Sequence, residues 1–174
     1  MAQKIDFAKL TLKDALDLAI LIEEEAKVRY DEFARLVGGR YPGDADEVFK
    51  NMAVYEAKHR DELKARRQKL FGAAPVSVTL DAIDDVEAPD RGQPRVFMSP
   101  RQAMEVALVS EEKAWAYFDD ALRHVKDPDV SKLFGELRAE EKQHQEYIKK
   151  AMVTLPTGPD VEEDEADAPG SDAG

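Results

Sequence analysis

The sequence has no cysteine among its 174 residues. A chain without thiols cannot form a disulfide, a zinc–thiolate site or an iron–sulfur centre, and thiol catalysis is excluded as well. Long apolar runs are also missing. The longest, LAILI at residues 18–22, is far too short to span a bilayer, and the first residues show no secretory signal. We therefore expect a soluble, cytoplasmic protein that does not use a membrane as a partner.

Aromatic residues and glycines are scarce as well. Aromatics make up 7% of the chain and there are nine glycines, whereas charged residues reach 36%. This composition favours helices over a β-sandwich. The formal net charge of −12 argues against nucleic acid as a partner, because a polyanion would be repelled.

Four segments carry their apolar residues at alternating steps of three and four, which is the period of a helix. They begin after residues suited to N-capping, namely Thr11, Asp44, Ser99 and Asp127. Residues 72–99 form a connection that is long for a compact domain and typical of a crossover between two helix hairpins. The sequence predicts an all-α four-helix bundle over residues 1–155 and an acidic, disordered tail over residues 156–174.

The two halves of the chain repeat one pattern. The first half reads EEEAKVRY at 23–30 and then YEAKHRDEL at 55–63, and the second reads EEKAWAYF at 111–118 and then EEKQHQEYI at 140–148. Each half therefore supplies one glutamate on its first helix and a Glu-x-x-His pair on its second. Residues three apart on a helix share a face, so each pair points to the same side.

Two hairpins packed face to face would bring four carboxylates and two imidazoles together in the bundle core. Four carboxylates in a low-dielectric core repel one another, and two divalent cations would neutralise them. Oxygen-rich ligation with a few nitrogens suits iron, with manganese possible. The candidate ligands are Glu23, Glu56, His59, Glu111, Glu141 and His144.

A single Glu-x-x-His on a helix is usually a solvated pair, and it is the coincidence of both pairs with the inward stripes that points to a metal site. The third histidine, His124, has no such pattern and is expected at the surface. Tyr30 lies two turns after Glu23 on the same face. It either fills the core or acts on the site, through a hydrogen bond to a ligand carboxylate or a redox role.

At these residues the chain resembles the ferritin-like superfamily, and within it the rubrerythrin branch, over residues 11–153. The resemblance implies a ferritin-like bundle with two iron ions. It implies terminal carboxylates at Glu23 and Glu111 and bridging carboxylates at Glu56 and Glu141. The imidazoles of His59 and His144 would be terminal ligands, and Tyr30 would donate a hydrogen bond to a ligand carboxylate from the other half. Dimers are common in this family, so the resemblance also implies a homodimer.

Two departures from the rubrerythrin pattern stand out. The family usually carries a cysteine-rich rubredoxin domain, so this chain would need an external electron donor such as a rubredoxin-like protein. The family also has a further glutamate three residues after the third-helix ligand, and this chain has Ala114 there. That absence moves the expected site towards the six-ligand pattern of ferroxidase centres.

The leading interpretation is a di-iron oxidoreductase that reduces hydrogen peroxide or dioxygen, for peroxide scavenging or ferroxidase activity. Iron storage or delivery is an alternative, and a manganese catalase-like enzyme or an oxygenase is another. A metal-free structural bundle would leave six polar side chains unpaired in the core, at a cost of several kcal/mol.

Overall fold

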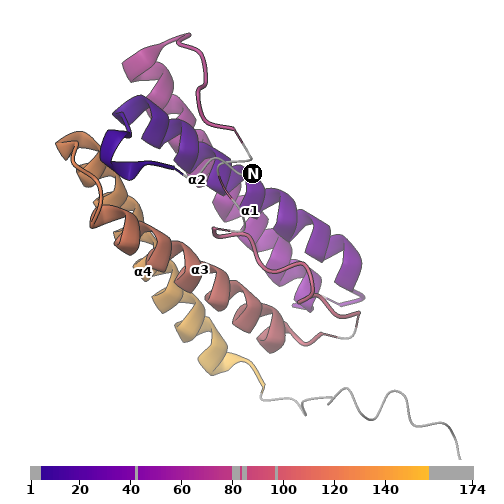
Figure 1. Ribbon diagram of the computed structural model, residues 1–174. Helices are drawn as coiled ribbons and strands as arrows, with labels where there is room; N and C mark the ends of the chain where they lie inside the picture. Colours follow the sequence, from indigo (N-terminus) through magenta and orange to yellow (C-terminus); the bar gives the residue numbers. More distant parts are fainter. Residues whose placement is uncertain (1–4, 42, 80–82, 84–85, 97, 157–174) are drawn as a thin grey trace, which may run out of the picture.

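The computed structural model describes residues 5–41, 43–79, 83, 86–96 and 98–156. Four long helices dominate it: α1 (Leu12–Val37), α2 (Ala45–Phe71), α3 (Pro100–Leu122) and α4 (Pro128–Thr154). A short 3₁₀ helix, η1 (Phe7–Lys9), precedes them, and no strand occurs among the described residues. Helices α1 and α2 pack as one hairpin, α3 and α4 as a second, and the hairpins face each other (Figure 1). The predicted all-α bundle is confirmed.

Side-chain caps fix where three of the helices begin. Thr11 accepts a hydrogen bond from the backbone N–H of Asp14, and Ser99 forms a complete capping box with Gln102. Asp127 accepts from the first backbone N–H groups of α4. These contacts satisfy donors that a helix leaves without intrahelical partners, so the predicted starts are the observed ones.

Two apolar clusters fill the bundle, one towards each end. The first is built around Leu16, Phe118 and Phe134, and the second around Phe33 and Phe49. Every helix contributes buried residues to both clusters and changes from one to the other near its middle. Buried acidic side chains lie at these changeover points: Glu23 on α1, Glu56 on α2, Glu111 on α3 and Glu141 on α4. The fold therefore places a polar layer between two apolar cores.

The crossover joins α2 to α3 and runs along the bundle (Figure 1). Its first residues are held by Arg67, which donates to the carbonyls of Gly72 and Ala74 and is itself paired with the buried carboxylate of Asp17. Residues 75–79, which follow, are neither helix nor strand. Most of the predicted acidic tail, from residue 157 onward, lies outside the described residues.

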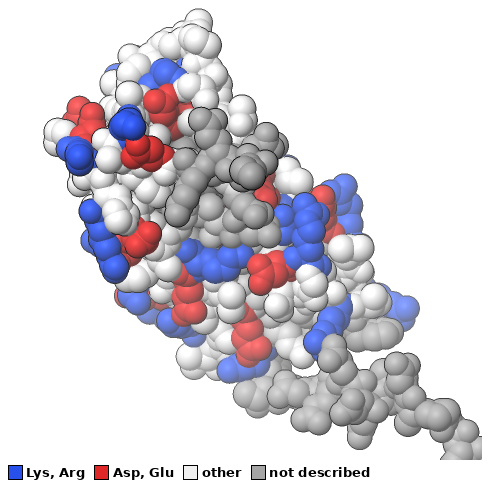
Figure 2. All heavy atoms as spheres, viewed as in Figure 1, with Lys and Arg blue, Asp and Glu red and all other residues white. Residues whose placement is uncertain are grey.

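The surface mixes charges of both signs. Figure 2 shows lysine and arginine side chains interspersed with aspartates and glutamates over the visible face, without a broad basic area among the described residues there. None of the helices in the described part of the chain is both long and apolar enough to cross a membrane.

Candidate metal centre

The six predicted ligands converge in the polar layer. They form two sets, Glu23, Glu56 and His59 from the first hairpin, and Glu111, Glu141 and His144 from the second. Within each set, one potential ligand atom from each residue lies within 4.8 Å of the others. The glutamates are at most 4% exposed, so water contributes little to their solvation. Each hairpin thus supplies two carboxylates and one imidazole, as the repeat predicts.

The two imidazoles bring the hairpins into contact. The rings of His59 and His144 stack with their centroids 4.7 Å apart and an interplanar angle of 5°. The Nδ1 atom of His144 lies 3.0 Å from Oε2 of Glu111, and Nδ1 of His59 lies 3.9 Å from Oε2 of Glu23. Both rings therefore turn the same nitrogen towards a carboxylate of their own hairpin.

A fifth carboxylate, Glu87, reaches the same layer from the crossover. It is 1% exposed and joins two further groups with ligand atoms within 4.8 Å, one with Glu23 and Glu141 and the other with Glu56 and Glu111. Sequence reasoning missed it, because the helical period that identifies the other ligands does not apply to a loop. The only signal is an acid between apolar neighbours, Val86 and Ala88, and acids at 84 and 85 stand nearby.

Many carboxylate oxygens of this cluster are buried without a hydrogen-bond partner among the described residues. They are Oε2 of Glu23, both oxygens of Glu56, both of Glu87, Oε1 of Glu111 and Oε2 of Glu141. Native proteins seldom leave buried polar atoms unpaired, because each costs about 1–3 kcal/mol. Divalent cations would satisfy these oxygens and neutralise their charge, so the donor set fits a pair of hard or borderline metal ions.

Burial and mutual repulsion favour the protonated form of four of these carboxyl groups, Glu23, Glu56, Glu87 and Glu111. Burial raises the pKa of Glu23, Glu87 and Glu111 well above the ordinary value, and the charge of neighbouring glutamates raises it further. Burial likewise raises the pKa of Glu56 to about 7. A metal ion must displace such protons to bind, so metal affinity should increase with pH.

The pKa values of the two histidines shift in opposite directions. Burial would lower the pKa of His144, but its hydrogen bonds with Glu111 and Glu141 outweigh that effect and raise the pKa to about 10. Burial lowers the pKa of His59, and the charge of His144 lowers it further. In the metal-free site one imidazolium thus partly offsets the carboxylates, a role that a cation would take over.

Tyr30 is fully buried, and the side chain of Ser110 on α3 is the polar group that interacts with its hydroxyl. Burial raises its pKa well above the usual value, and the charges of Glu111 and Glu56 add to the shift. The hydroxyl therefore lies within electrostatic range of predicted ligands from both hairpins, Glu111 and Glu56. The predicted hydrogen bond to a ligand carboxylate is not among those the structure forms, and the role of Tyr30 stays a prediction.

Two hollows lead to the site between α2 and α4. One is a cavity of about 160 Å³ lined by His59, His144 and the ring pair Tyr55–Tyr147, whose centroids are 6.1 Å apart. The other, of about 210 Å³, also borders His59 and carries Glu62, Glu140 and the ion pair between Arg66 and Glu136. Small molecules and cations can therefore approach the imidazole side of the cluster. His124 lies apart from it, exposed just beyond the end of α3.

Comparison with known proteins agrees with this arrangement. A family model described as Rubrerythrin matches residues 14–152. An uncharacterized conserved protein from Magnetospirillum magnetotacticum is similar in structure, with 29% identity and a TM-score of 0.64 over 86% of this chain and 98% of that one. A search of curated proteins found no match.

Two more distant structures share the fold. A hypothetical protein from Pyrococcus furiosus has 20% identity and a TM-score of 0.54 over 84% of this chain and 90% of that one. A dodecameric thioferritin, the bacterioferritin-related protein from Bacteroides fragilis, has 20% identity and a TM-score of 0.50 over 82% of this chain and 84% of that one.

Proposed function

The chain belongs to the rubrerythrin family, and from this premise we propose that it is a di-iron oxidoreductase that reduces hydrogen peroxide or dioxygen. The observation that carries the proposal is the meeting of two matching Glu, Glu, His sets in a buried layer, where five of the eight carboxylate oxygens of the sets have no donor among the described residues. Such a layer is costly to keep unless cations occupy it.

The assignment of roles follows the two sets. Glu23 with Glu56 and His59 would hold one ion, and Glu111 with Glu141 and His144 the other. Glu56 and Glu141 would bridge the ions, as the resemblance to the family implies, and all four glutamates lie near enough to a carboxylate of the opposite hairpin for the two ions to share the layer. The imidazoles fill terminal positions without adding charge.

A bound iron pair would supply the two electrons that reduce hydrogen peroxide or dioxygen. The two Glu, Glu, His sets would hold the ions, and the buried layer would keep bulk water away from them. The cavity beside Tyr55 and Tyr147 would admit a small oxidant to the histidine side. Because the sequence has no cysteine, the electrons that restore the reduced state would come from an external donor such as a rubredoxin-like protein.

The test begins with an anaerobic Fe(II) titration of metal-free protein, and two tightly bound ions per chain are expected. The loaded protein is then mixed with equal amounts of hydrogen peroxide or dioxygen, and oxidation is followed by absorbance. Faster reaction with peroxide supports scavenging, whereas faster reaction with dioxygen supports a ferroxidase. Fewer than two ions per chain would refute the paired site. Oxygen release from peroxide by manganese-loaded protein, without any reductant, would point to a catalase instead.

Replacing either histidine with alanine should lower metal affinity by about 10- to 100-fold while the helices persist. The reason is that each imidazole is the nitrogen donor of one set, the second imidazole already belongs to the opposite set, and His124 lies apart from the cluster. Fe(II) titration of His59→Ala and His144→Ala measures the loss, and circular dichroism checks the fold. His124→Ala is the matched control, and its affinity should equal that of the unaltered protein. Full iron content in His59→Ala or His144→Ala would remove that residue from the ligand set.

Iron storage or delivery is the second candidate, favoured by the fold shared with a protein described as a dodecameric thioferritin. Storage needs a closed shell, so the mass of the assembly in solution separates the two functions. A homodimer, as proposed here, excludes a shell made by this chain alone. A mass near that of twelve chains would favour storage.

A further inference from the structure

Resting on the proposed metal pair, we propose that Glu87 is a seventh protein ligand and that metal binding thereby fixes the crossover to the bundle. The side chain comes from the long connection between the hairpins, not from a helix. Nothing in the repeated sequence pattern assigns it a role, because the pattern has no counterpart in the crossover.

The position of Glu87 is central to the cluster. One of its oxygens can approach ligand atoms of Glu23 and Glu141, and one can approach those of Glu56 and Glu111, in each case within 4.8 Å. It therefore neighbours carboxylates from all four helices. A side chain that reaches both hairpins from outside them is placed to contact either ion or to bridge the two.

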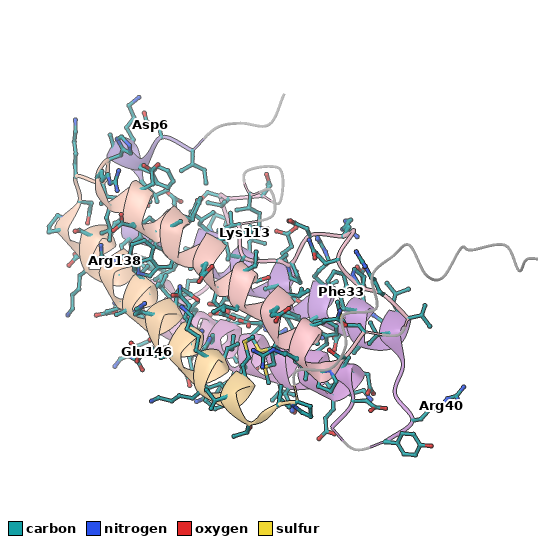
Figure 3. All side chains as sticks on the ribbon, turned by 90° about the horizontal axis from the view of Figure 1, so that it is seen from below. Asp6, Phe33, Arg40, Lys113, Arg138 and Glu146 are labelled. Atoms are coloured by element: carbon teal, nitrogen blue, oxygen red, sulfur yellow. The ribbon has the colours of Figure 1, made fainter. Side chains whose placement is uncertain are left out.

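The crossover is held so that this side chain points inward. Arg29 on α1 donates to the carbonyl of Pro89 at 2.7 Å, and Lys113 on α3 donates to the carbonyl of Ala88 at 3.0 Å. Lys113, which is labelled in Figure 3, also forms an ion pair with Asp90 at 2.9 Å. The anchors lie on the first helix of each hairpin, whereas the open cavities are lined by α2 and α4. Glu87 thus approaches the cluster from a side that those cavities do not use.

A purely structural role does not account for Glu87. Asp17 shows how this chain treats a buried carboxylate that only supports the fold, since it accepts hydrogen bonds from both Arg67 and Lys13. Both oxygens of Glu87 are buried, and no basic, hydroxyl or backbone donor among the described residues reaches them, although the side chain forms a hydrogen bond with the carboxyl group of Glu56. Without metal, a carboxyl group surrounded by four others avoids repulsion by holding a proton, whereas cations would stabilise its charged form.

A fifth carboxylate also changes the charge balance of the site. Five carboxylates and two Fe(II) ions give −5 + 4 = −1, whereas two Fe(III) ions give −5 + 6 = +1. With the four helical carboxylates alone, the same sums are 0 and +2. Glu87 therefore favours the oxidised pair, and its removal should make the loaded protein easier to reduce.

The first test compares Glu87→Gln with the unaltered protein and with Glu112→Gln, which alters an exposed carboxylate next to a ligand. Anaerobic Fe(II) titration should show at least about tenfold weaker binding in Glu87→Gln and no change in Glu112→Gln. A redox titration of the loaded proteins should show a higher potential for Glu87→Gln. Unaltered affinity and potential would overturn the inference while leaving the metal pair intact. Failure of the unaltered protein to bind two ions would overturn both proposals.

The second test measures how readily a protease cuts the crossover. Trypsin can cut after Arg91, which is exposed in the crossover. Fe(II) should slow this cut several-fold in the unaltered protein and in Glu112→Gln, but not in Glu87→Gln. Equal metal-dependent protection of Glu87→Gln would contradict the proposal. If Glu87→Gln does not fold, Glu87→Asp, which keeps the charge but shortens the reach, should show the same loss of protection.

Discussion

Loading the metal-free protein with two equivalents of Fe(II), without oxygen, should raise its melting temperature by about 10 °C at pH 7. In the metal-free state the buried layer holds five carboxyl groups whose oxygens largely lack partners. Ions that bind only the folded chain stabilise it by about 4 kcal/mol when present at a thousand times the dissociation constant. Differential scanning fluorimetry or calorimetry under anaerobic conditions measures the shift.

The same reasoning fixes how the stability of the metal-free protein depends on pH. Burial raises the folded-state pKa of Glu56 to about 7, above its value of 4.5 in the unfolded chain. Between these values the folded state binds more protons, so stability falls as the pH rises through this window. His144, whose folded pKa is raised to about 10, loses its contribution above pH 6.5 in the same direction. His59, with a lowered pKa, acts oppositely but only as the pH falls below its unfolded value.

The effect of metal should therefore be smallest at pH 5 and grow towards pH 8, because protons and cations compete for the same oxygens. A melting temperature that does not respond to iron at any pH in this range would contradict the buried centre. A Mg²⁺ titration serves as a control for general ionic effects, since Mg²⁺ dehydrates reluctantly and disfavours nitrogen ligands.

The helical parts of the site could be predicted because they depend on local rules. Apolar residues that recur at alternating steps of three and four define a buried stripe on each helix. These stripes include Glu23, Glu56, Glu111 and Glu141, and the Glu-x-x-His spacing adds the imidazoles. The caps at Thr11 and Ser99 mark where helices begin, and the structure forms both. The repeat supplies the remaining information, since equal hairpins that pack face to face bring equivalent residues together.

Features that depend on distant contacts could not be predicted in this way. Glu87 enters the layer only because Arg29 and Lys113, on different helices, hold the backbone on either side of it. No periodicity distinguishes it from neighbouring acids. The buried pair between Asp17 and Arg67 is similar, because the two residues are 50 positions apart and each looks like an ordinary solvated residue on its own helix.

The crossover combines a feature that local rules predict with one that depends on distant contacts. In the sequence it is a long connection that links two hairpins, and the expected site had six ligands because Ala114 replaces a further helical glutamate. The structure keeps Ala114 as a buried core residue and supplies the additional carboxylate from the connection instead. The crossover is thus part of the candidate centre as well as a link between its halves.

Replacing Glu56 with glutamine should have the largest effect on metal binding, with affinity for both ions falling by more than about 100-fold. Glu56 would be a bridging ligand, so its loss would affect both ions, and it lies near Glu23 and His59 as well as near Glu87 and Glu111. Anaerobic titration should then find at most one weakly bound ion per chain. Glu146→Gln, at an exposed glutamate on α4 labelled in Figure 3, is the control and should bind two ions normally.

The metal-free form of Glu56→Gln should respond in the opposite direction and become more stable at pH 8. Glutamine removes a buried charge whose pKa is raised from 4.5 to about 7, a difference equivalent to about 3 kcal/mol. Urea denaturation of metal-free proteins at pH 5 and pH 8 measures this gain, which should fall below about 1 kcal/mol at the lower pH. A variant that merely misfolds would lose both metal binding and stability. Weaker metal binding together with a more stable metal-free protein is the result expected if Glu56 is a ligand, because its buried charge is then compensated only when metal is bound.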